Sequence, residues 1–442
     1  MKSIGIDIGT TTISIVVTEG DPPRVKERAT LPNGSSLPSG HPWERAQDPD
    51  AILRQVKPAL DRFLAGGGVG CIGLTGQMHG ILYVDRDGRA LSPLYTWQDG
   101  RGDIAVLQGK SACQLLREQG VKTAPGYGTA THLYNRLAGA VPSNAASFCT
   151  IADYVGMALT GRDRPLLHTS QAASLGLFDV VRRRFCPEAA QGLFPDAALF
   201  PAVSPELETL GRYQGVPVTA SLGDNQASFL GSVRRAGESL LVNVGTGSQI
   251  SLYSPAYWEG PGIEARPFLG DSFLLVGAAL CGGAAYAALE GFFREYAVAS
   301  GGPDVPQYAV MARLLEKGPA QAWQVRTTFS GTREDPAQAG SIQGIRLENF
   351  HPASLVRGVL WGMAEELAQL YHTVRQGTGL RPLRLVAAGN GVRQNPALGQ
   401  IIAQRFHMPL TLVENQEEAA FGAALGALAA NGQLSFPQWL GL

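Results

Sequence analysis

Two glycine–threonine turns in the chain could bind phosphate. Residues 4–14 read IGIDIGTTTIS and residues 241–251 read LVNVGTGSQIS, so each turn lies between two β-branched runs. In such a strand–turn–strand hairpin, a glycine lets backbone amides point at an anion with no Cβ in the way. We therefore expect two sets of phosphate ligands, Gly9, Thr10 and Thr11 in the first turn and Gly245, Thr246 and Gly247 in the second.

Two aspartates near these turns could supply the remaining chemistry of phosphoryl transfer. Asp7 ends the first strand run, where a carboxylate can hold a hydrated Mg²⁺ against phosphates, whereas the second copy has Asn243 in this place. Asp224 lies between apolar segments, where solvation does not explain a carboxylate. Phosphoryl transfer needs a base for the accepting hydroxyl, and Asp224 fits that role. The alternative interpretation is that Asp224 caps a helix starting near Asn225.

The composition excludes several classes of partner. The 442 residues carry a net charge of −1, with acidic and basic residues interspersed, so we expect neither nucleic acid nor membrane as a partner. The 55 glycines exceed the usual share of about 7%. The five cysteines are scattered and odd in number, which predicts free thiols in a reducing compartment. Because Asp7 interrupts the apolar N-terminal run, we expect no signal peptide and a cytoplasmic location.

Strands alternate with helices around these residues. In the first half we expect strands at 69–75 and 80–85 and helices at 50–65, 131–138 and 151–160. In the second half we expect strands at 272–280, 384–388 and 408–413 and helices at 396–406 and 417–430. Since the two turns lie about half a chain apart, the pattern predicts a duplicated, layered α/β domain, divided into residues 1–231 and 232–442.

The other common nucleotide motifs are incomplete. Gly109, Lys110 and Ser111 suggest a P-loop, but the glycine required five positions before the first of them is Ile104. No GxGxxG sequence follows an expected strand.

The motifs, in this order, resemble the FGGY family of carbohydrate kinases, within the superfamily of sugar kinases, Hsp70 and actin. Residues 7–11 and 243–248 resemble its two phosphate motifs, 223–227 (GDNQA) the segment of the catalytic aspartate, and 417–424 its closing helix. Residues 388–391 (AGNG) resemble its adenosine segment, with Asn390 where many relatives have glycine. The resemblance covers essentially the whole chain.

This resemblance implies an α/β fold of two actin-like, ribonuclease H-like domains that flank a central cleft and close over it. It also implies ATP and Mg²⁺ as cofactors, with Asp224 as the catalytic base and Asp7 as the metal ligand. Gly389, Asn390 and Gly391 would then bind the adenosine.

The resemblance also points to a sugar site in the first half. Gln77, Met78 and His79 occupy the place where the family binds its substrate; a Met–His pair is similar to the ketose kinases, whereas glycerol kinases carry Arg–Glu there. Trp97 would offer an aromatic face to sugar C–H groups, and Asp99 and Arg101 would bind hydroxyls. Asp224 and Asn225 complete the expected contacts.

The function implied is ATP-dependent phosphorylation of a ketose at its terminal primary hydroxyl. The segments TWQDGR (96–101) and SQAASLGLF (170–178) resemble kinases acting on sedoheptulose, which would give sedoheptulose 7-phosphate. D-xylulose, another pentulose or a polyol is the alternative substrate, and a catalytically silent sugar sensor is the non-enzymatic alternative. The expected partners are the sugar and ATP. A homodimer is the oligomeric state that we consider.

Overall fold

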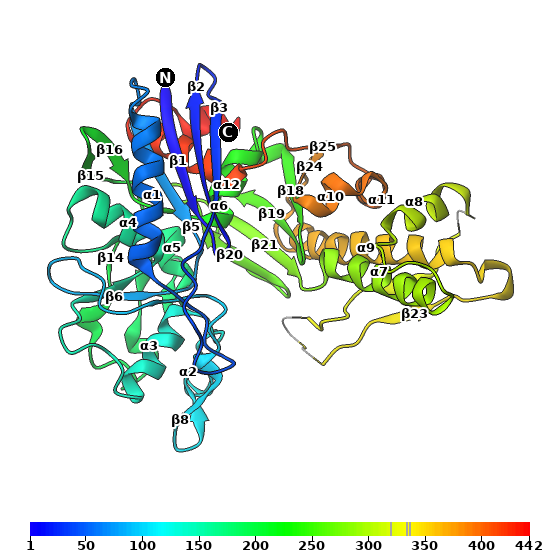
Figure 1. Cartoon of the computed structure of the whole chain (residues 1–442), viewed down its shortest axis with the longest axis horizontal. Coiled ribbons are helices and arrows are strands. Elements are labelled where there is room, and N and C mark those ends of the chain that lie inside the picture. Colours follow the sequence, from blue (N-terminus) through cyan, green and yellow to red (C-terminus); the bar gives the residue numbers. More distant parts are fainter. Residues whose placement is uncertain (319–320, 333–334, 336) are drawn as a thin grey trace. The chain divides into compact units, whose positions relative to one another are not determined.

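The computed structural model describes residues 1–442 except 319–320, 333–334 and 336. The chain forms two compact units (Figure 1). Unit 1 comprises residues 1–234, 266–273 and 415–442, and unit 2 comprises residues 235–265 and 274–414. The first division, after Arg234, lies close to the expected boundary. The last 28 residues depart from the linear division into 1–231 and 232–442, because 415–442 pack in unit 1.

Unit 1 is built on a mixed sheet of seven strands. Its strands are β1 (Lys2–Ile8), β2 (Thr12–Glu19), β3 (Arg24–Pro32), β5 (Cys71–Gly76), β15 (Thr209–Tyr213), β16 (Val216–Thr219) and β17 (Leu222–Gly223). They follow the order β15-β16-β5-β1-β2-β3, and β17 also pairs with β5. The pair β1–β2 is antiparallel, whereas β5 runs parallel to both β1 and β17. The carboxyl ends of β1, β5 and β17 therefore meet at one edge of the sheet.

Helices with clear sequence signals cover this sheet. Helix α1 (Pro49–Leu64) begins after Asp48, whose side chain accepts from the amides of Asp50 and Ala51. Helix α4 (Ile151–Thr160) begins after the capping Thr150 and ends at Gly161 in the left-handed conformation. Figure 1 shows α1 running alongside the sheet. The buried core between them includes Ile4, Ile6, Ile15, Val56, Leu60 and Val155.

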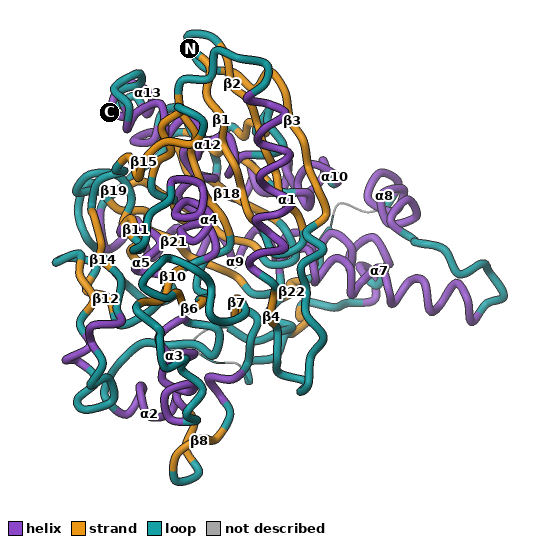
Figure 2. The backbone as a smooth tube through the Cα atoms, turned by 60° about the vertical axis from the view of Figure 1, so that its left-hand side comes forward, coloured by secondary structure: helices purple, strands orange, loops and turns teal. Residues whose placement is uncertain are grey.

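The closing helix α12 (Glu418–Ala430) packs directly on the strands of unit 1. A Cβ on Gly5 of β1 would lie 1.8 Å from the Ala420 carbonyl oxygen, and one on Gly73 of β5 would lie 1.9 Å from that of Ala423. Only glycine permits such close contact between a helix and a sheet. Figure 2 shows α12 beside the β1–β2 hairpin, near the N-terminus of the chain. These glycines place residues 415–442 in unit 1.

Unit 2 repeats the arrangement. Its sheet has the order β20-β21-β19-β18-β24-β25, formed by β18 (Ser239–Val244), β19 (Ser248–Ser254), β20 (Ile263–Pro267), β21 (Phe273–Ala279), β24 (Arg384–Ala388) and β25 (Leu410–Leu412). The pair β18–β19 is antiparallel, and β18–β24 and β24–β25 are parallel. The main helices are α7 (Gly282–Ala299), α8 (Tyr308–Lys317), α9 (Pro352–Thr378) and α11 (Pro396–Phe406).

The two sheets confirm the duplication expected from the sequence. In each, an antiparallel hairpin carrying a glycine–threonine turn pairs in parallel with a third strand, β5 in unit 1 and β24 in unit 2. Asp7 pairs with Thr75 and Asn243 pairs with Ala388, so the two residues occupy equivalent positions. The layered α/β prediction is therefore confirmed. Helices α4 and α11 and strand β24 match their expected ranges, and the boundaries of the other expected elements shift by a few residues.

Two further expectations concern the whole chain. Within the described ranges, none of the helices is long and apolar enough to cross a bilayer. The five cysteines are free thiols, with Cys186 half-buried and the other four buried.

Candidate active site

The first glycine–threonine turn joins β1 to β2. A hydrogen bond from the Gly9 amide to the Thr12 carbonyl oxygen (2.9 Å) closes it. Asn33 Nδ2 donates to the Gly9 carbonyl oxygen (2.8 Å). A Cβ on Gly9 would lie 2.9 Å from the Thr12 carbonyl oxygen, so the turn requires glycine. Thr11 is exposed at the tip, as a phosphate ligand must be.

Thr10 joins this turn to the segment that follows β5. Its hydroxyl donates to Gln77 Oε1 (3.3 Å) and accepts from the indole Nε1 of Trp97 (3.0 Å). Gln77 Nε2 donates to Gln47 Oε1 (2.8 Å), and Gln47 Nε2 donates to the Thr10 carbonyl oxygen (2.8 Å). Thr10, Gln77 and Gln47 therefore form a closed ring of hydrogen bonds. Gln47, in β4 (Ala46–Gln47), carries no motif by which the sequence could have identified it.

Asp7 and Asp224 lie at the same edge of the sheet. Strand β5 lies between β1 and β17, and its residue Gly76 pairs with Ile8 on one side and Gly223 on the other. Asp7 directly precedes the first of these partners, and Asp224 directly follows the second. Burial, and then the charges of Asp224 and Glu417, raise the pKa of Asp7 to about 7. The carboxylates of Asp224 and Glu417 therefore repel that of Asp7.

Asp224 is the first residue of helix α6 (Asp224–Ser232). Burial raises its pKa, while the positive charge of Arg266 and a hydrogen bond from the Asn225 amide oppose that rise. The residue preceding the helix is Gly223, which has no capping side chain. The cap interpretation is therefore replaced by one in which the helix N-terminus stabilises the Asp224 carboxylate.

Arg266 was not identified from the sequence. It belongs to the short segment 266–273 that packs in unit 1, although it lies about forty residues beyond Asp224 in the chain. Gln226 Nε2 donates to the Pro267 carbonyl oxygen (2.9 Å), and the rings of Phe229 and Phe268 lie 5.6 Å apart. These contacts fasten the segment to α6, directly behind Asp224.

The acidic residues fit a magnesium ion that also binds phosphate. Within the described ranges, no three His, Cys, Asp or Glu side chains converge as a complete metal site. Mg²⁺ in phosphoryl-transfer sites is held by one or two carboxylates, with water and substrate phosphates completing the shell. Asp7, beside the phosphate turn, meets that requirement, because a cation there would relieve the repulsion that raises its pKa.

Met78 and His79 follow β5 at the same edge. Met78 is buried, and a Cβ on Gly223 would lie 2.9 Å from its Cε, so it packs directly beside the segment of Asp224. His79 has a positive φ of 72°. Its Nδ1 donates to the Ser174 carbonyl oxygen (2.7 Å), and its ring stacks on Tyr127 with centroids 4.7 Å apart. These contacts fix both the tautomer and the orientation of the imidazole.

Trp97 differs from its neighbours in exposure. It is 49% exposed, although its indole nitrogen is bonded to Thr10. An exposed, oriented aromatic face is what the C–H groups of a sugar require.

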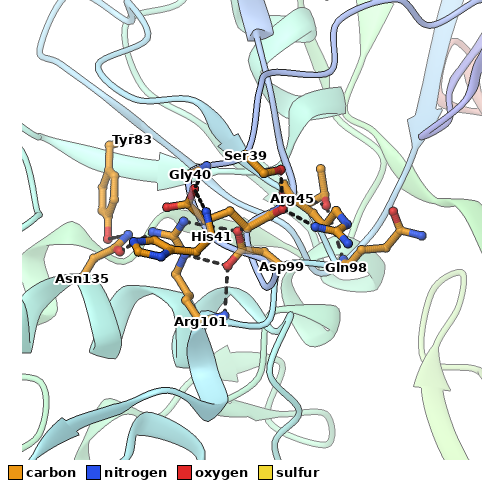
Figure 3. A network of polar contacts seen from close by, with 11 residues as sticks. Ser39, Gly40, His41, Arg45, Tyr83, Gln98, Asp99, Arg101 and Asn135 are labelled. Atoms are coloured by element: carbon orange, nitrogen blue, oxygen red, sulfur yellow. Dashed lines mark hydrogen bonds and ion pairs between the residues drawn. The ribbon is translucent and has the colours of Figure 1, made fainter.

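Asp99 and Arg101, by contrast, form a buried pair. Asp99 is 0% exposed and Arg101 is 7% exposed. Arg101 Nε donates to Asp99 Oδ1 (2.7 Å), and its Nη1 donates to Asn135 Oδ1 (2.7 Å). Asp99 Oδ2 also accepts from the Arg45 amide (3.0 Å). Figure 3 shows Arg101 between Asp99 and Asn135. Because the pair satisfies itself, it shapes the loop that carries Trp97, and this burial argues against direct binding of a sugar hydroxyl.

Helix α5 (Thr169–Ser174) supports both sides of this site. Ser170 Oγ accepts from the Gly223 amide (2.9 Å), and Gln171 Nε2 donates to the Leu222 carbonyl oxygen (2.9 Å). Ser174 Oγ accepts from the His79 amide (3.1 Å). One short helix thus holds the residues before Asp224 and the backbone of His79. Within 170–178, the sequence offered only a family likeness as a signal.

A buried histidine orients Ser170. Burial lowers the pKa of His168 to about 4, so its ring is neutral at physiological pH. Its Nε2 donates to the Pro205 carbonyl oxygen (3.2 Å), which leaves Nδ1 to accept from the Ser170 hydroxyl (2.7 Å). Ser170 Oγ is thereby left as an acceptor for the Gly223 amide, and the three bonds form a directed chain.

The second glycine–threonine turn joins β18 to β19 in unit 2. The Gly245 amide donates to the Gly247 carbonyl oxygen (2.9 Å). The N-terminus of α7 packs against this turn, since the amides of Gly283 and Ala284 donate to the carbonyl oxygens of Gly245 and Thr246 (both 2.9 Å). A Cβ on Gly282 would lie 2.5 Å from the Gly247 carbonyl carbon, so this contact also depends on glycine.

The expected adenosine segment follows β24. Gly389 has a φ of 89°, and a Cβ there would lie 2.4 Å from the Val244 carbonyl oxygen, so this glycine packs on β18. Asn390 begins the short helix α10 (Asn390–Gln394). Of the three expected residues, Gly391 lines a cavity of about 710 Å³. Gly389 and Asn390 directly precede Gly391 and are not among the described residues that line the cavity.

Aromatic side chains complete this cavity. Tyr286 of α7 and Tyr308 of α8 stack with centroids 5.8 Å apart. Asn395, Pro396 and Gln400, which follow α10 or lie on α11, line the opposite wall. The volume and the aromatic pair suit a flat heterocycle such as adenine. The tyrosines lie in segments that carried no motif, so the sequence did not identify them.

Two family models match the chain. The N-terminal domain of the FGGY family of carbohydrate kinases matches residues 3–231, and its C-terminal domain matches residues 240–431. Mouse sedoheptulokinase is 26% identical, with 96% of each chain covered. Glycerol kinase from Thermus brockianus is 27% identical, covering 98% of this chain and 90% of its own. Xylulose kinase from Haemophilus influenzae is 24% identical, covering 97% and 91%.

Solved structures share the fold. The xylulose kinase from Rhodospirillum rubrum superposes with a TM-score of 0.84 at 23% identity, covering all of this chain and 92% of its own. The gluconate kinase from Lactobacillus acidophilus gives the same score at 19% identity, covering 99% and 92%.

Proposed function

Because the chain belongs to the FGGY family of carbohydrate kinases, we propose that it transfers the γ-phosphoryl group of ATP to the terminal primary hydroxyl of a ketose, sedoheptulose first. The product is sedoheptulose 7-phosphate. Family membership makes the protein a carbohydrate kinase, with a sugar and ATP as its substrates. The observation that carries the reaction is the meeting of Asp7 and Asp224 at the carboxyl end of β5, beside the first phosphate turn.

Asp224 acts as the general base in this proposal. Its carboxylate accepts the proton of the sugar hydroxyl as that oxygen attacks the γ-phosphorus and the bond to the β-phosphate oxygen breaks. Burial favours the protonated acid, but Arg266 and the Asn225 amide favour the carboxylate. Both contacts therefore favour the ionised form in which Asp224 acts as a base.

Asp7 holds Mg²⁺ in this proposal. The ion supplies charge neutralisation for the phosphates of ATP. Gly9, Thr10 and Thr11 bind phosphate from unit 1, and Gly245, Thr246 and Gly247 bind it from unit 2. The cavity beside Gly391 receives adenosine, with Gly389 and Asn390 as its support.

The sugar is bound by Trp97, Met78, His79 and Asn225. Asn225 is 8% exposed, and its Oδ1 has no hydrogen-bond partner among the described residues, so it is available to a hydroxyl donor. Gln77, Asp99 and Arg101 support the residues that contact the sugar, because their own polar atoms are hydrogen-bonded within the protein. Functionally, residues 1–231 would provide the sugar site and the base, and residues 232–442 the nucleotide site.

The Met78–His79 pair supports a ketose as substrate. The choice of sedoheptulose is supported by the segments 96–101 and 170–178 and by the likeness to the mouse enzyme over nearly the full length of both chains. D-xylulose is the second substrate to consider, because xylulose kinases are also similar over most of this chain. Homodimer formation and a cytoplasmic location stay predictions from the sequence.

A substrate panel tests the proposal. ADP release by the purified protein would be coupled to NADH oxidation with sedoheptulose, D-xylulose, ribulose, fructose and glycerol as acceptors. We expect the highest kcat/KM with sedoheptulose. A higher value with D-xylulose would change the substrate but keep the reaction. Release no faster than with water alone, for every sugar, would favour a silent sugar sensor.

A further inference from the structure

We propose that unit 2 carries a second anion site, separate from the reaction, that binds a small phosphomonoester where the C-terminal ends of α9 and α11 meet. The site is a cavity of about 370 Å³. Its described lining holds five basic side chains and no acidic one: His372, Arg375, Arg381, Arg405 and His407.

Three segments bring these side chains together. Helix α9 contributes His372 and Arg375, whereas Arg405 lies in the last turn of α11 and His407 caps that helix in the left-handed conformation (φ 53°). Arg381 lies between α9 and β24, outside any helix. The cavity is therefore assembled from parts of the chain about thirty residues apart, which the sequence alone does not bring together.

The floor of the cavity is apolar and rigid. Tyr371 and Phe406 are both buried, and their rings stack with centroids 5.9 Å apart. The ring of His372 lies 6.0 Å from that of Tyr371. A floor of this kind suits the carbon body of a metabolite, while the basic rim suits its charged group.

Two of the three guanidinium groups have no acidic partner. Arg405 is paired with Glu365 through two hydrogen bonds, one of them 2.9 Å from Nη2 to Oε1. Within the part of the chain that the structure describes, Arg375 and Arg381 form no side-chain hydrogen bond or ion pair. Both lie close enough to Tyr371 to oppose the rise that burial causes in the pKa of its phenol. Arg375 and Arg381 are solvent-exposed, so two unneutralised cations border the mouth of one small cavity.

Helix capping does not account for this cluster. Basic residues at helix C-termini offset the helix dipole, which would explain Arg375 and Arg405. However, the terminal carbonyls are already bonded by backbone amides, from Gly379 to Arg375 (2.9 Å) and from Met408 to Ala403 (3.2 Å). Arg381 lies outside both helices, so the dipole gives no reason for its position.

The chemistry favours phosphate on a small molecule. Two guanidinium forks match the oxygens of a phosphate group, and a cavity of this size holds a metabolite. A nucleic acid would need a longer basic stripe, but the charges of this chain are interspersed.

The site is distinct from the nucleotide cavity. Pro396, Gln400 and Gln404, which recur every four residues along α11, line the nucleotide cavity, whereas Arg405 and Phe406 of the same helix line the basic one. Residues four apart share one helix face, so the two cavities use different faces of α11. A metabolite bound at the basic end would therefore be an effector and not a substrate, whichever sugar the enzyme phosphorylates.

Isothermal titration tests the proposal. The full chain would be saturated with Mg²⁺ and a non-hydrolysable ATP analogue, so that the nucleotide cavity is filled, and titrated with ribose 5-phosphate and with ribose. We expect ribose 5-phosphate to bind and ribose to bind at least tenfold more weakly. Arg375→Ser/Arg381→Ser should raise the Kd for ribose 5-phosphate at least tenfold. Arg24→Ser/Arg313→Ser, which removes the same charge at two exposed positions, should leave it unchanged.

Two results would overturn the site. One is no binding of ribose 5-phosphate to the saturated protein, and the other is binding that the Arg375→Ser/Arg381→Ser variant leaves intact. The single variant Arg381→Ser controls for a folding defect in the double variant, because Arg381 lies outside any helix. That variant should keep the unfolding temperature of the parent protein and still weaken binding; unchanged binding would count against the proposal.

Discussion

Asp224 and Asp7 are both half-buried aspartates beside β5, yet their surroundings separate their roles. Asp224 has Arg266 and a helix N-terminus to favour its charge. Asp7 has two further carboxylates nearby, and its pKa rises to about 7. A base must stay ionised, whereas a carboxylate among carboxylates gains most from a cation. These surroundings support the proposal that Asp224 accepts the proton and Asp7 binds the metal.

Asp224→Asn should lower kcat by about 10²- to 10⁴-fold, because it removes the base and keeps the shape of the side chain. The Kd for ATP should be nearly unchanged. Burial raises the pKa of Asp224 above the ordinary value of 3.8. The rate of the unmodified enzyme should therefore rise with pH as Asp224 loses its proton, and the midpoint of this rise should lie above pH 3.8. Steady-state kinetics across pH measures both effects. Asp61→Asn, at an aspartate of α1 that accepts from the side chains of Tyr213 and Gln214, serves as the control and should keep its kcat. Near-normal turnover in Asp224→Asn would remove Asp224 as the base.

Asp7→Asn should respond differently. The variant keeps the base but loses the anionic ligand, so the Mg²⁺ concentration for half-maximal rate should rise at least tenfold. Titrating Mg²⁺ at saturating ATP and sugar measures this change. If the half-maximal concentration matched that of the parent enzyme, Asp7 would not be the metal ligand.

The sequence singles out contiguous motifs more readily than the residues that support them. Asp224 and the two glycine–threonine turns each form a short contiguous motif, and their roles stay predictions. Asp99 and Arg101 were interpreted as sugar ligands, but they are buried by contacts with Asn135 and Arg45, 34 and 54 residues away in the chain. Arg266 and Gln47 act only through folded neighbours. Such roles depend on tertiary contacts, which a single sequence does not display.

At the scale of elements, helix α5 is the support that both halves of the sugar site share. Its side chains form hydrogen bonds with the backbone of Leu222 and Gly223, which precede the proposed base Asp224, and with the backbone of His79. A displacement of about 1 Å at a reacting group can cost on the order of 10²-fold in rate. Bonds far from the reacting atoms can therefore matter to turnover.

Ser170→Ala should lower kcat by about 10- to 100-fold while changing the KM for ATP less than twofold. The lost bond to the Gly223 amide frees the turn that aims Asp224. Ser147→Ala is the matched control, since Ser147 is a buried serine whose hydroxyl donates to the Leu199 carbonyl oxygen (3.0 Å), away from the site. Both variants should lose about 0.5–1.5 kcal/mol of unfolding free energy. Equal kcat values for the two variants would make Ser170 a structural residue only.

Most elements could be predicted because their ends carry local signals. Helix α4 begins at a capping threonine and ends at a left-handed glycine, and the sequence placed it correctly. Helix α12 was expected at 417–430, but the linear division assigned it to the second domain. Its packing depends on Gly5 and Gly73, more than 300 residues earlier in the chain. Glycines in a strand indicate close contact without saying with which partner.

At the scale of the whole molecule, the chain passes between its two units at four places: 234/235, 265/266, 273/274 and 414/415. Closure of the domains stays a prediction from the family resemblance. Sedoheptulose with a non-hydrolysable ATP analogue should reduce the radius of gyration in X-ray scattering, and either ligand alone should reduce it less. Superimposable curves for the free and doubly liganded protein would contradict closure.

The most direct test of the account is the product itself. The protein would be incubated with sedoheptulose, ATP and Mg²⁺ and followed by ³¹P nuclear magnetic resonance with proton coupling. We predict that the γ-phosphate signal is replaced by that of a phosphomonoester coupled to the two protons of one CH₂ group, as position 7 of the sugar requires. Conversion of ATP to ADP and inorganic phosphate, with the sugar unchanged, would contradict the account.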